Sequence, residues 1–212
     1  MIAASVIFNS VSCRYGRATV VDTVELGVAA GEHVALTGSN GSGKTTLLRA
    51  ALGLHPLAGG TVTVGGQPAR SPSDWVRRRR EVAWVPQRLA TGCFPLLVDE
   101  LLASAGAGAE EAGRAADRLG VRGLGARPLH TLSGGQLQRA FLARALGCVA
   151  AGAGVVFADE PSAALDFDGQ EQVASLLAGL PVTVVVISHD RAVTRACDRV
   201  AEMAAGRLRV VA

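Results

Sequence analysis

The segment GSNGSGKTT, residues 38–46, constrains the fold of this chain more than any other feature. It follows the apolar run HVALT and opens the apolar stretch TTLLRAALGL. The spacing Gly38-x-x-x-x-Gly43-Lys44-Thr45 is the pattern of a phosphate-binding loop, in which a strand ends in a glycine-rich turn and a helix begins. The segment therefore predicts an α/β protein with a phosphate site at the start of that helix.

Lys44 is the single lysine of the chain; the other twenty of the 21 basic residues are arginine. A lysine ammonium is a compact charge on a flexible stem that reaches phosphate oxygens, whereas the planar guanidinium of arginine is bulkier. We expect Lys44 to bridge the β- and γ-phosphates and the Thr45 hydroxyl to ligate Mg²⁺. The residues expected to contact the nucleotide here are Gly38, Ser39, Asn40, Gly41, Ser42, Gly43, Lys44, Thr45 and Thr46.

Size and composition point to one domain of a protein without its own membrane span. The 212 residues are enough for one domain with a substantial core, and the net charge of +3 is too weak to argue for a nucleic-acid partner. The longest apolar stretch, residues 145–158, is shorter than the roughly 20 residues that a spanning helix needs. The cysteines show no paired spacing, so we expect free, buried thiols in a reducing compartment at Cys13, Cys93, Cys148 and Cys197.

Hydrophobic patterning along the chain alternates between strands and helices. Apolar runs predict strands at 5–11, 20–28, 33–37, 82–85, 155–158 and 182–187. Helices are predicted at 44–54, 110–119, 136–149 and 169–180. The alternation implies a mostly parallel sheet, the segment TVTVGGQP predicts a hairpin turn, and residues 96–130 are expected to form an inserted helical subdomain.

Two acidic residues in VVFADEPSAALD, residues 155–166, end a continuously apolar strand. A carboxylate in such a place is costly unless it binds a cation or water. We expect Asp159 to hold Mg²⁺ through its hydration shell. Glu160 is then placed to activate the water that attacks the γ-phosphate.

A second anion site is predicted in LSGGQLQRAFLARAL, residues 132–146, where Ser-Gly-Gly precedes a helix. Two anion sites in one small domain suggest that one of them serves a nucleotide held by another copy of the chain.

These motifs, followed by SHD at residues 188–190, occur in one order that resembles the ATP-binding subunit of ABC transporters over essentially the whole chain. The resemblance implies an ATPase of the P-loop ABC-ATPase fold, with a mostly parallel core sheet, an antiparallel β subdomain and an inserted helical subdomain. It divides the single domain 1–212 into a RecA-like core at about 1–87 and 150–212 and a helical subdomain at about 88–149.

The same resemblance assigns roles to matching residues. Tyr15 is the aromatic residue that stacks on adenine, and Gln87 reaches Mg²⁺ and the attacking water. His189 contacts the γ-phosphate and Asp166 belongs to the loop that links two active sites. Two copies are implied to bind head to tail around two ATP molecules, each site being completed by residues of the other copy: Ser133, Gly134, Gly135 and Gln136.

The resemblance also implies partners and a location. An integral membrane permease carries the substrate, the chain lies on the cytoplasmic face of the membrane, and an importer adds an extracytoplasmic substrate-binding protein. The segments VPQRLATGCFPLLVDELL, LDFDGQEQ and SHDRAVTRACDRV are most similar to the ATPase subunits of zinc and manganese importers. A haem exporter subunit is the alternative, followed by a non-transport ABC ATPase; a phosphate-loop kinase would not need LSGGQ.

Several other features receive a structural interpretation. We expect RRRR at 77–80 to form a solvated helix face rather than a lipid-binding patch, and Trp75 and Trp84 to be packing residues. No role is assigned to His33, His55 or His130. The alanines of PSAALD depart from the polar or bulky residues common in the family, which puts coupling between two sites in question.

Overall fold

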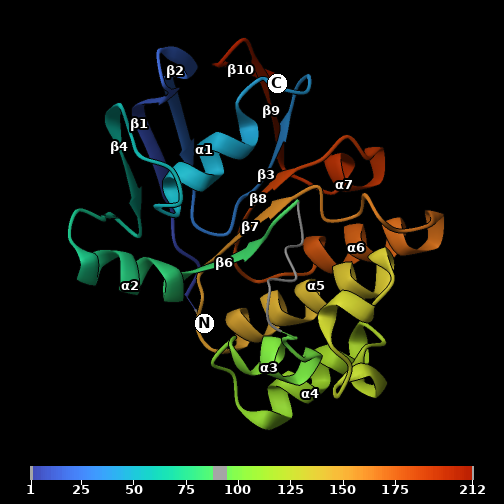
Figure 1. Ribbon diagram of the computed structural model, residues 1–212. Helices are drawn as coiled ribbons and strands as arrows, with labels where there is room; N and C mark the ends of the chain where they lie inside the picture. The colour runs from blue at the N-terminus through green and yellow to red at the C-terminus, as the bar shows by residue number, and fades with distance from the viewer. Residues whose placement is uncertain (1, 88–94, 212) are drawn as a thin grey trace.

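The computed structural model describes residues 2–87 and 95–211, which form two sheets flanked by helices (Figure 1). The larger sheet has six strands in the order β10-β9-β3-β8-β7-β6. Its strands β9, β3, β8, β7 and β6 run parallel, and only β10 is antiparallel. Their bounds are β3 His33–Thr37, β6 Val82–Val85, β7 Val155–Asp159, β8 Thr183–Ile187, β9 Arg199–Ala204 and β10 Arg207–Val211.

The smaller sheet is antiparallel, with strand order β2-β1-β4-β5. Its strands are β1 Val6–Tyr15, β2 Ala18–Val28, β4 Gly59–Val64 and β5 Gln67–Pro68. Apolar and polar residues alternate along β1, so one face is buried and the other exposed, as a sheet covered on one side requires. By contrast, all residues of β7 and β8 are buried, because helices or the second sheet cover both faces.

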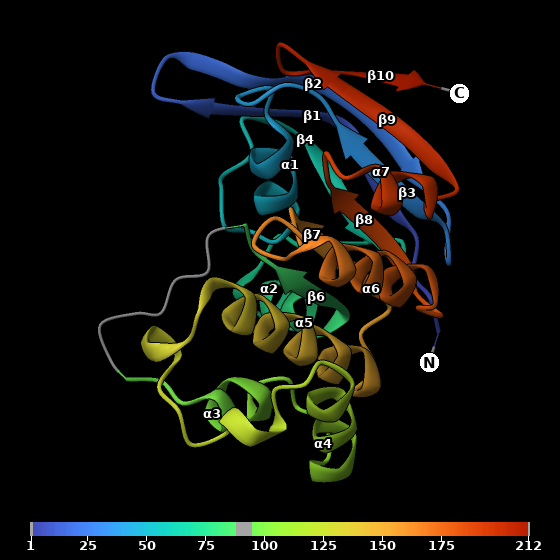
Figure 2. The ribbon, with the colours of Figure 1, turned by 90° about the vertical axis from the view of Figure 1, so that its right-hand side faces the viewer.

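Helix α1 (Lys44–Ala51) lies between the two sheets, and α5 (Gly134–Ala150) and α6 (Phe167–Ala178) cover the opposite face of the parallel sheet (Figure 2). One core cluster joins the antiparallel sheet and α1 to β3, and a second joins the parallel sheet to α5 and α6. The remaining helices are α2 Pro72–Glu81, α3 Val98–Ala103, α4 Ala109–Arg118 and α7 Arg191–Arg195, with short 3₁₀ turns at Arg122–Leu124 and Leu129–Thr131.

The helical part formed by α3, α4 and the start of α5 has a core of its own. It projects away from both sheets (Figure 2). Helix α5 contributes Ala140 and Ala143 to this core but Leu142 and Val149 to the core under the parallel sheet. Because α5 belongs to both clusters, this one uninterrupted helix connects the helical part to the parallel sheet.

The α/β class, the parallel sheet and the antiparallel hairpins are confirmed. The helix predicted at 44–54 ends at Ala51, because the chain turns into the left-handed region at Gly53. Strands β9 and β10 were not predicted, since RVAEMA and RLRVV carry charges that mask their alternation. No helix in the described ranges is long and apolar enough to cross a membrane.

The interpretation of RRRR at 77–80 as a solvated face is wrong for Arg78, whose side chain is 1% exposed. Helical periodicity turns Arg78 inward on the same side as Trp75, where its guanidinium donates to the carbonyls of Ala51 and Gln67 at 2.9 and 2.8 Å. Burial of a cation is costly unless its donors find partners, and these carbonyls accept from both terminal nitrogens, whereas Nε has no hydrogen-bond partner among the described residues. Arg79 and Arg80 are exposed as expected.

The cysteines within the described ranges are free thiols. Cys13 is buried, whereas Cys148 and Cys197 are only partly buried, so the prediction of burial is confirmed for Cys13 alone. Burial raises the pKa of the Cys197 thiol to about 11. Cys93 lies outside the described residues.

Candidate functional site

Most of the residues predicted to bind nucleotide or to act in catalysis converge where the parallel strands end. Val85 pairs with Ala158, and both Asp159 and Leu36 pair with Ile187. The carboxyl ends of β6, β7, β8 and β3 therefore lie level, and ligands of α/β proteins bind at this edge of the sheet. A cleft of about 370 Å³ opens here, lined by Tyr15, Val20, Asn40, Gly41, Ser42, Gly43, Lys44, Thr45, Thr46, Gln87, Asp159, Glu160 and Ile187.

The glycine loop between β3 and α1 is closely packed against other strands. A Cβ on Gly38 would overlap the Met203 carbonyl oxygen of β9, and one on Gly43 would lie 2.5 Å from the Val20 carbonyl oxygen of β2. Both glycines also have positive φ, of 128° and 104°. Only glycine therefore fits at either position, and two strands distant in sequence hold the shape of the loop.

Lys44 is folded back into this loop, with its side chain almost buried. Its ammonium donates to the carbonyl oxygens of Gly38 at 2.6 Å and Ser39 at 2.9 Å, and to the Ser42 hydroxyl at 3.3 Å. Burial lowers the pKa of Lys44, and the nearby Glu160 and Asp159 carboxylates oppose that change. The carbonyls of Gly38 and Ser39 thus orient the ammonium without lining the cleft, whereas the residues from Asn40 to Thr46 line it.

Thr45 and Asp159 form an oxygen-rich pair at the floor of the cleft. The Thr45 hydroxyl donates to Oδ2 of Asp159 at 2.7 Å, and Asp159 is 1% exposed. Its other oxygen, Oδ1, is buried without a hydrogen-bond partner among the described residues. Burial accordingly raises the pKa of Asp159. A buried, unsatisfied carboxylate oxygen beside a hydroxyl fits a hard cation such as Mg²⁺, which prefers oxygen ligands.

Glu160 faces His189 across the ends of β7 and β8. His189 Nε2 lies 3.5 Å from Oε1 of Glu160, and the side chains of His189 and Glu160 are 53% and 14% exposed. The Glu160 backbone adopts φ of 50°, held by its N–H donating to the Ile187 carbonyl at 2.8 Å. Burial raises the pKa of Glu160, while the neighbouring His189 lowers it. A non-glycine residue kept in this unfavourable region is often found at functional sites.

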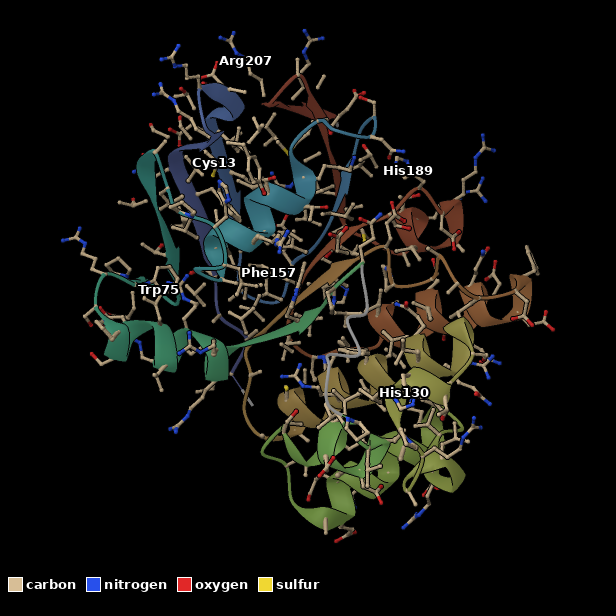
Figure 3. The ribbon with its side chains drawn as sticks, viewed as in Figure 1. Cys13, Trp75, His130, Phe157, His189 and Arg207 are labelled. Atoms are coloured by element: carbon tan, nitrogen blue, oxygen red, sulfur yellow. The ribbon has the colours of Figure 1, made fainter. Side chains whose placement is uncertain are left out.

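Tyr15 and Gln87 complete the rim of the cleft. Tyr15 is the last residue of β1, and Gln87 lies two residues beyond β6; both are exposed and both line the cleft. Figure 3 shows His189 near the same end of the sheet, whereas His130 lies in the helical part.

The second predicted anion site does not belong to this cleft. Among the described residues, the cleft lining includes neither the segment 133–136 nor Asp166. Ser133 caps α5, accepting from the Gln136 N–H at 3.3 Å while its own N–H donates to the Gln136 side chain at 3.1 Å. Asp166 caps α6 by accepting from the Gly169 N–H at 3.0 Å. These residues form a separate exposed surface, in which Gly134 lies beside Ala164.

Sequence reasoning missed several residues around the site. Val20 and Ile187 line the cleft as apolar wall residues without a motif of their own. Ser162 is 2% exposed and donates to Asp190 at 3.2 Å, which joins the turn after Glu160 to the turn after His189. The position of Ser162 inside the acidic motif could have drawn attention to it. His55, given no role, packs against Tyr15.

Comparison with known proteins agrees with this geometry. The ABC transporter family model matches residues 21–163. The zinc transport system ATP-binding protein TroB of Treponema pallidum (strain Nichols) is 37% identical over 215 residues, covering 93% of this chain and 77% of the relative. The hemin import ATP-binding protein HmuV of Nocardia farcinica (strain IFM 10152) is 42% identical over 209 residues, covering 89% and 69%.

Among solved structures, the dimeric structure of MJ0796, a bacterial ABC transporter cassette, superposes with a TM-score of 0.86 at 26% identity and covers 96% of both chains. A post-hydrolysis structure of the same cassette, bound to ADP and Pi, matches with a TM-score of 0.83. Sequence, cleft and fold thus agree: the chain belongs to the ABC transporter family and is an ATP-hydrolysing, ATP-binding subunit of a transporter.

Proposed function

We propose that this chain hydrolyses ATP to drive the import of zinc or manganese through a separate integral membrane permease. The observation that carries the ATPase chemistry is the hydrogen bond from Thr45 to the buried Asp159, placed between the phosphate loop and Glu160, with Oδ1 of Asp159 unpaired among the described residues. Zinc or manganese as substrate is supported by relatives named for zinc and manganese transport, TroB among them.

Each residue has a proposed task in the cleft. Lys44 and the loop amides bind the β- and γ-phosphates, and Tyr15 stacks on the adenine. Thr45, Asp159 and Gln87 would hold Mg²⁺, which would supply positive charge to neutralise the phosphates. Glu160 accepts the proton of the attacking water, and His189 orients Glu160 and contacts the γ-phosphate. The raised pKa of Glu160 makes it a better proton acceptor than an ordinary, fully solvated carboxylate.

We further propose that two copies assemble head to tail, with Ser133–Gln136 and Asp166 of one copy facing the nucleotide of the other. The dimeric structures of MJ0796 support this arrangement. The assembly lies on the cytoplasmic face of the membrane against its permease and, in an importer, works with an extracytoplasmic substrate-binding protein. ATP drives closure because only the closed dimer satisfies both anion sites.

Hemin import is the second candidate, because relatives named for hemin import match at comparable or higher identity. Hemin import shares its cargo with the haem exporter that the sequence offered as an alternative, but assigns the opposite direction of transport. The nucleotide cleft itself does not distinguish these cargoes, since the substrate passes through the permease.

In the first step of the test, a tagged Glu160→Gln variant of the chain, which should bind ATP without hydrolysing it, is captured together with its partners from solubilised membranes of its host. We expect a polytopic membrane protein to be recovered, and to accumulate zinc or manganese when it is reconstituted in vesicles with the wild-type chain. Lys44→Ala, which should lose nucleotide affinity, is the matched control. Accumulation of hemin instead would favour the second candidate, and recovery of soluble proteins alone would contradict the transporter proposal.

A further inference from the structure

We infer that His55 holds the ring of Tyr15 in place as the base-binding surface of the cleft, which makes His55 a positioning residue for nucleotide recognition. The inference rests on the proposed binding of ATP with its adenine against Tyr15. It adds a residue that carries no motif and that lies outside the cleft lining.

Tyr15 by itself is poorly restrained. It is the last residue of β1, ahead of the turn into β2, and its side chain is 52% exposed. An aromatic side chain with this much exposure samples several rotamers, and ordering it when a ligand binds lowers affinity. A residue that fixes the ring beforehand therefore strengthens binding without touching the ligand.

His55 is placed to do this from the loop between α1 and β4. The centroids of the His55 and Tyr15 rings lie 4.5 Å apart, with an angle of 43° between the ring planes. Nε2 of His55 lies 3.1 Å from the Arg14 carbonyl oxygen, which can only accept, so this nitrogen carries the proton. His55 thus contacts the ring of Tyr15 and the backbone immediately before it.

The loop that carries His55 is itself held at both ends. Leu54 N–H donates to the Arg49 carbonyl of α1 at 2.8 Å, and Ala58 N–H donates to the Ser12 carbonyl of β1 at 2.7 Å. The Trp75 ring of α2 packs over Gly53, where an added Cβ would lie 2.6 Å from it. Because α1, α2 and β1 all fix this loop, His55 acts as a rigid support for the tyrosine ring.

The experiment measures dissociation constants of the purified full chain by calorimetry, for ATP and for inorganic tripolyphosphate, which lacks the base. We expect His55→Ala to weaken ATP binding roughly three- to tenfold, as expected when one side chain must be ordered on binding, and to leave tripolyphosphate binding unchanged. His55→Phe, which keeps a ring, should retain affinity for ATP. His55→Gln, which keeps only a donor, should behave like His55→Ala.

Further variants separate this inference from the proposed function. Tyr15→Ala should weaken ATP binding, and adding His55→Ala to it should cause no further loss. Leu54→Ala, an exposed neighbour, is the control for loop damage. Unchanged ATP binding in His55→Ala, together with weakened binding in Tyr15→Ala, would overturn the inference alone. Unchanged binding in Tyr15→Ala would overturn both. Equal loss of ATP and tripolyphosphate in His55→Ala would show loop damage and also overturn the inference.

Discussion

The nucleotide cleft and the surface formed by Ser133–Gln136 and Asp166 are both marked by clear sequence motifs. They differ in whether their polar groups find partners within the single chain. In the cleft, Asp159 has a buried oxygen with no partner in the described ranges, and Glu160 already faces His189. On the other surface, Ser133, Gln136 and Asp166 are exposed or half-exposed and satisfy helix ends of their own chain.

This difference supports the proposal that folding alone assembles the first site, whereas the second is completed when two copies associate. A buried carboxylate oxygen without a partner at the floor of a cleft favours cation binding there, because the cost of burying that oxygen is then recovered. Capped helix ends are stable without a ligand, so the second surface stays available to a partner.

Glu160→Gln should reduce ATP turnover by about 10²- to 10⁴-fold, the usual contribution of a general base. The amide keeps the size of the side chain but cannot accept the proton of water. Calorimetry should show ATP affinity close to wild type, and phosphate release should be almost abolished. Wild-type turnover in this variant would remove Glu160 from the proposed chemistry.

Ser133→Asp should distinguish the role of the surface that carries Ser133 from the role of the nucleotide cleft. Aspartate caps a helix as well as serine does, so α5 and the free energy of unfolding should be preserved. In the proposed head-to-tail pair its negative charge would face the phosphates of the nucleotide bound to the other copy, so we expect turnover to fall by at least about tenfold. A tenfold fall corresponds to a loss of only about 1.4 kcal/mol.

ATP binding to the isolated Ser133→Asp chain should not change, and Ser133→Thr, which keeps the hydroxyl, serves as control. Wild-type turnover in Ser133→Asp would argue against completion of the site by a second copy.

Asp159→Asn should stabilise the nucleotide-free chain by about 1–3 kcal/mol, because a neutral amide costs less to bury than an ionised carboxylate whose second oxygen has no partner. Burial raises the pKa of Asp159 above its ordinary value of 3.8, so between the ordinary and the raised pKa the native state binds more protons than the unfolded state. Stability of the wild type therefore falls as pH rises through this window. The amide does not titrate, so thermal unfolding should show a larger gain from Asp159→Asn at pH 8 than at pH 4. An equal gain at both pH values would contradict a charged, unsatisfied Asp159 in the nucleotide-free chain.

Ser162→Ala should have the smallest effect, a roughly two- to tenfold loss of kcat, as expected for one hydrogen bond worth about 0.5–1.5 kcal/mol. The hydroxyl links the turn that carries Glu160 to the turn that carries His189. KM for ATP should be unchanged, and Ser162→Thr should restore kcat. A change in KM with constant kcat would show that this contact serves binding instead.

Much of the cleft was predictable because its residues occur in contiguous motifs. The phosphate loop, Asp159 and Glu160 each follow an apolar run that is typical of a strand, and parallel strands bring their carboxyl ends together. His55 and the buried Arg78 could not be identified in this way. Their partners lie in other elements: His55 contacts Tyr15, and Arg78 binds the carbonyls of Ala51 and Gln67.

The sequence alone determined the fold class, the phosphate loop and the order of the acidic and Ser-Gly-Gly motifs, because these depend on local spacing and hydrophobic periodicity. Tertiary structure alone decided that β9 and β2 hold the glycine loop and that Asp159 keeps an oxygen unpaired within the described part of the chain. Burial and long-range contacts arise only when distant segments pack together, so they leave no local trace in the sequence.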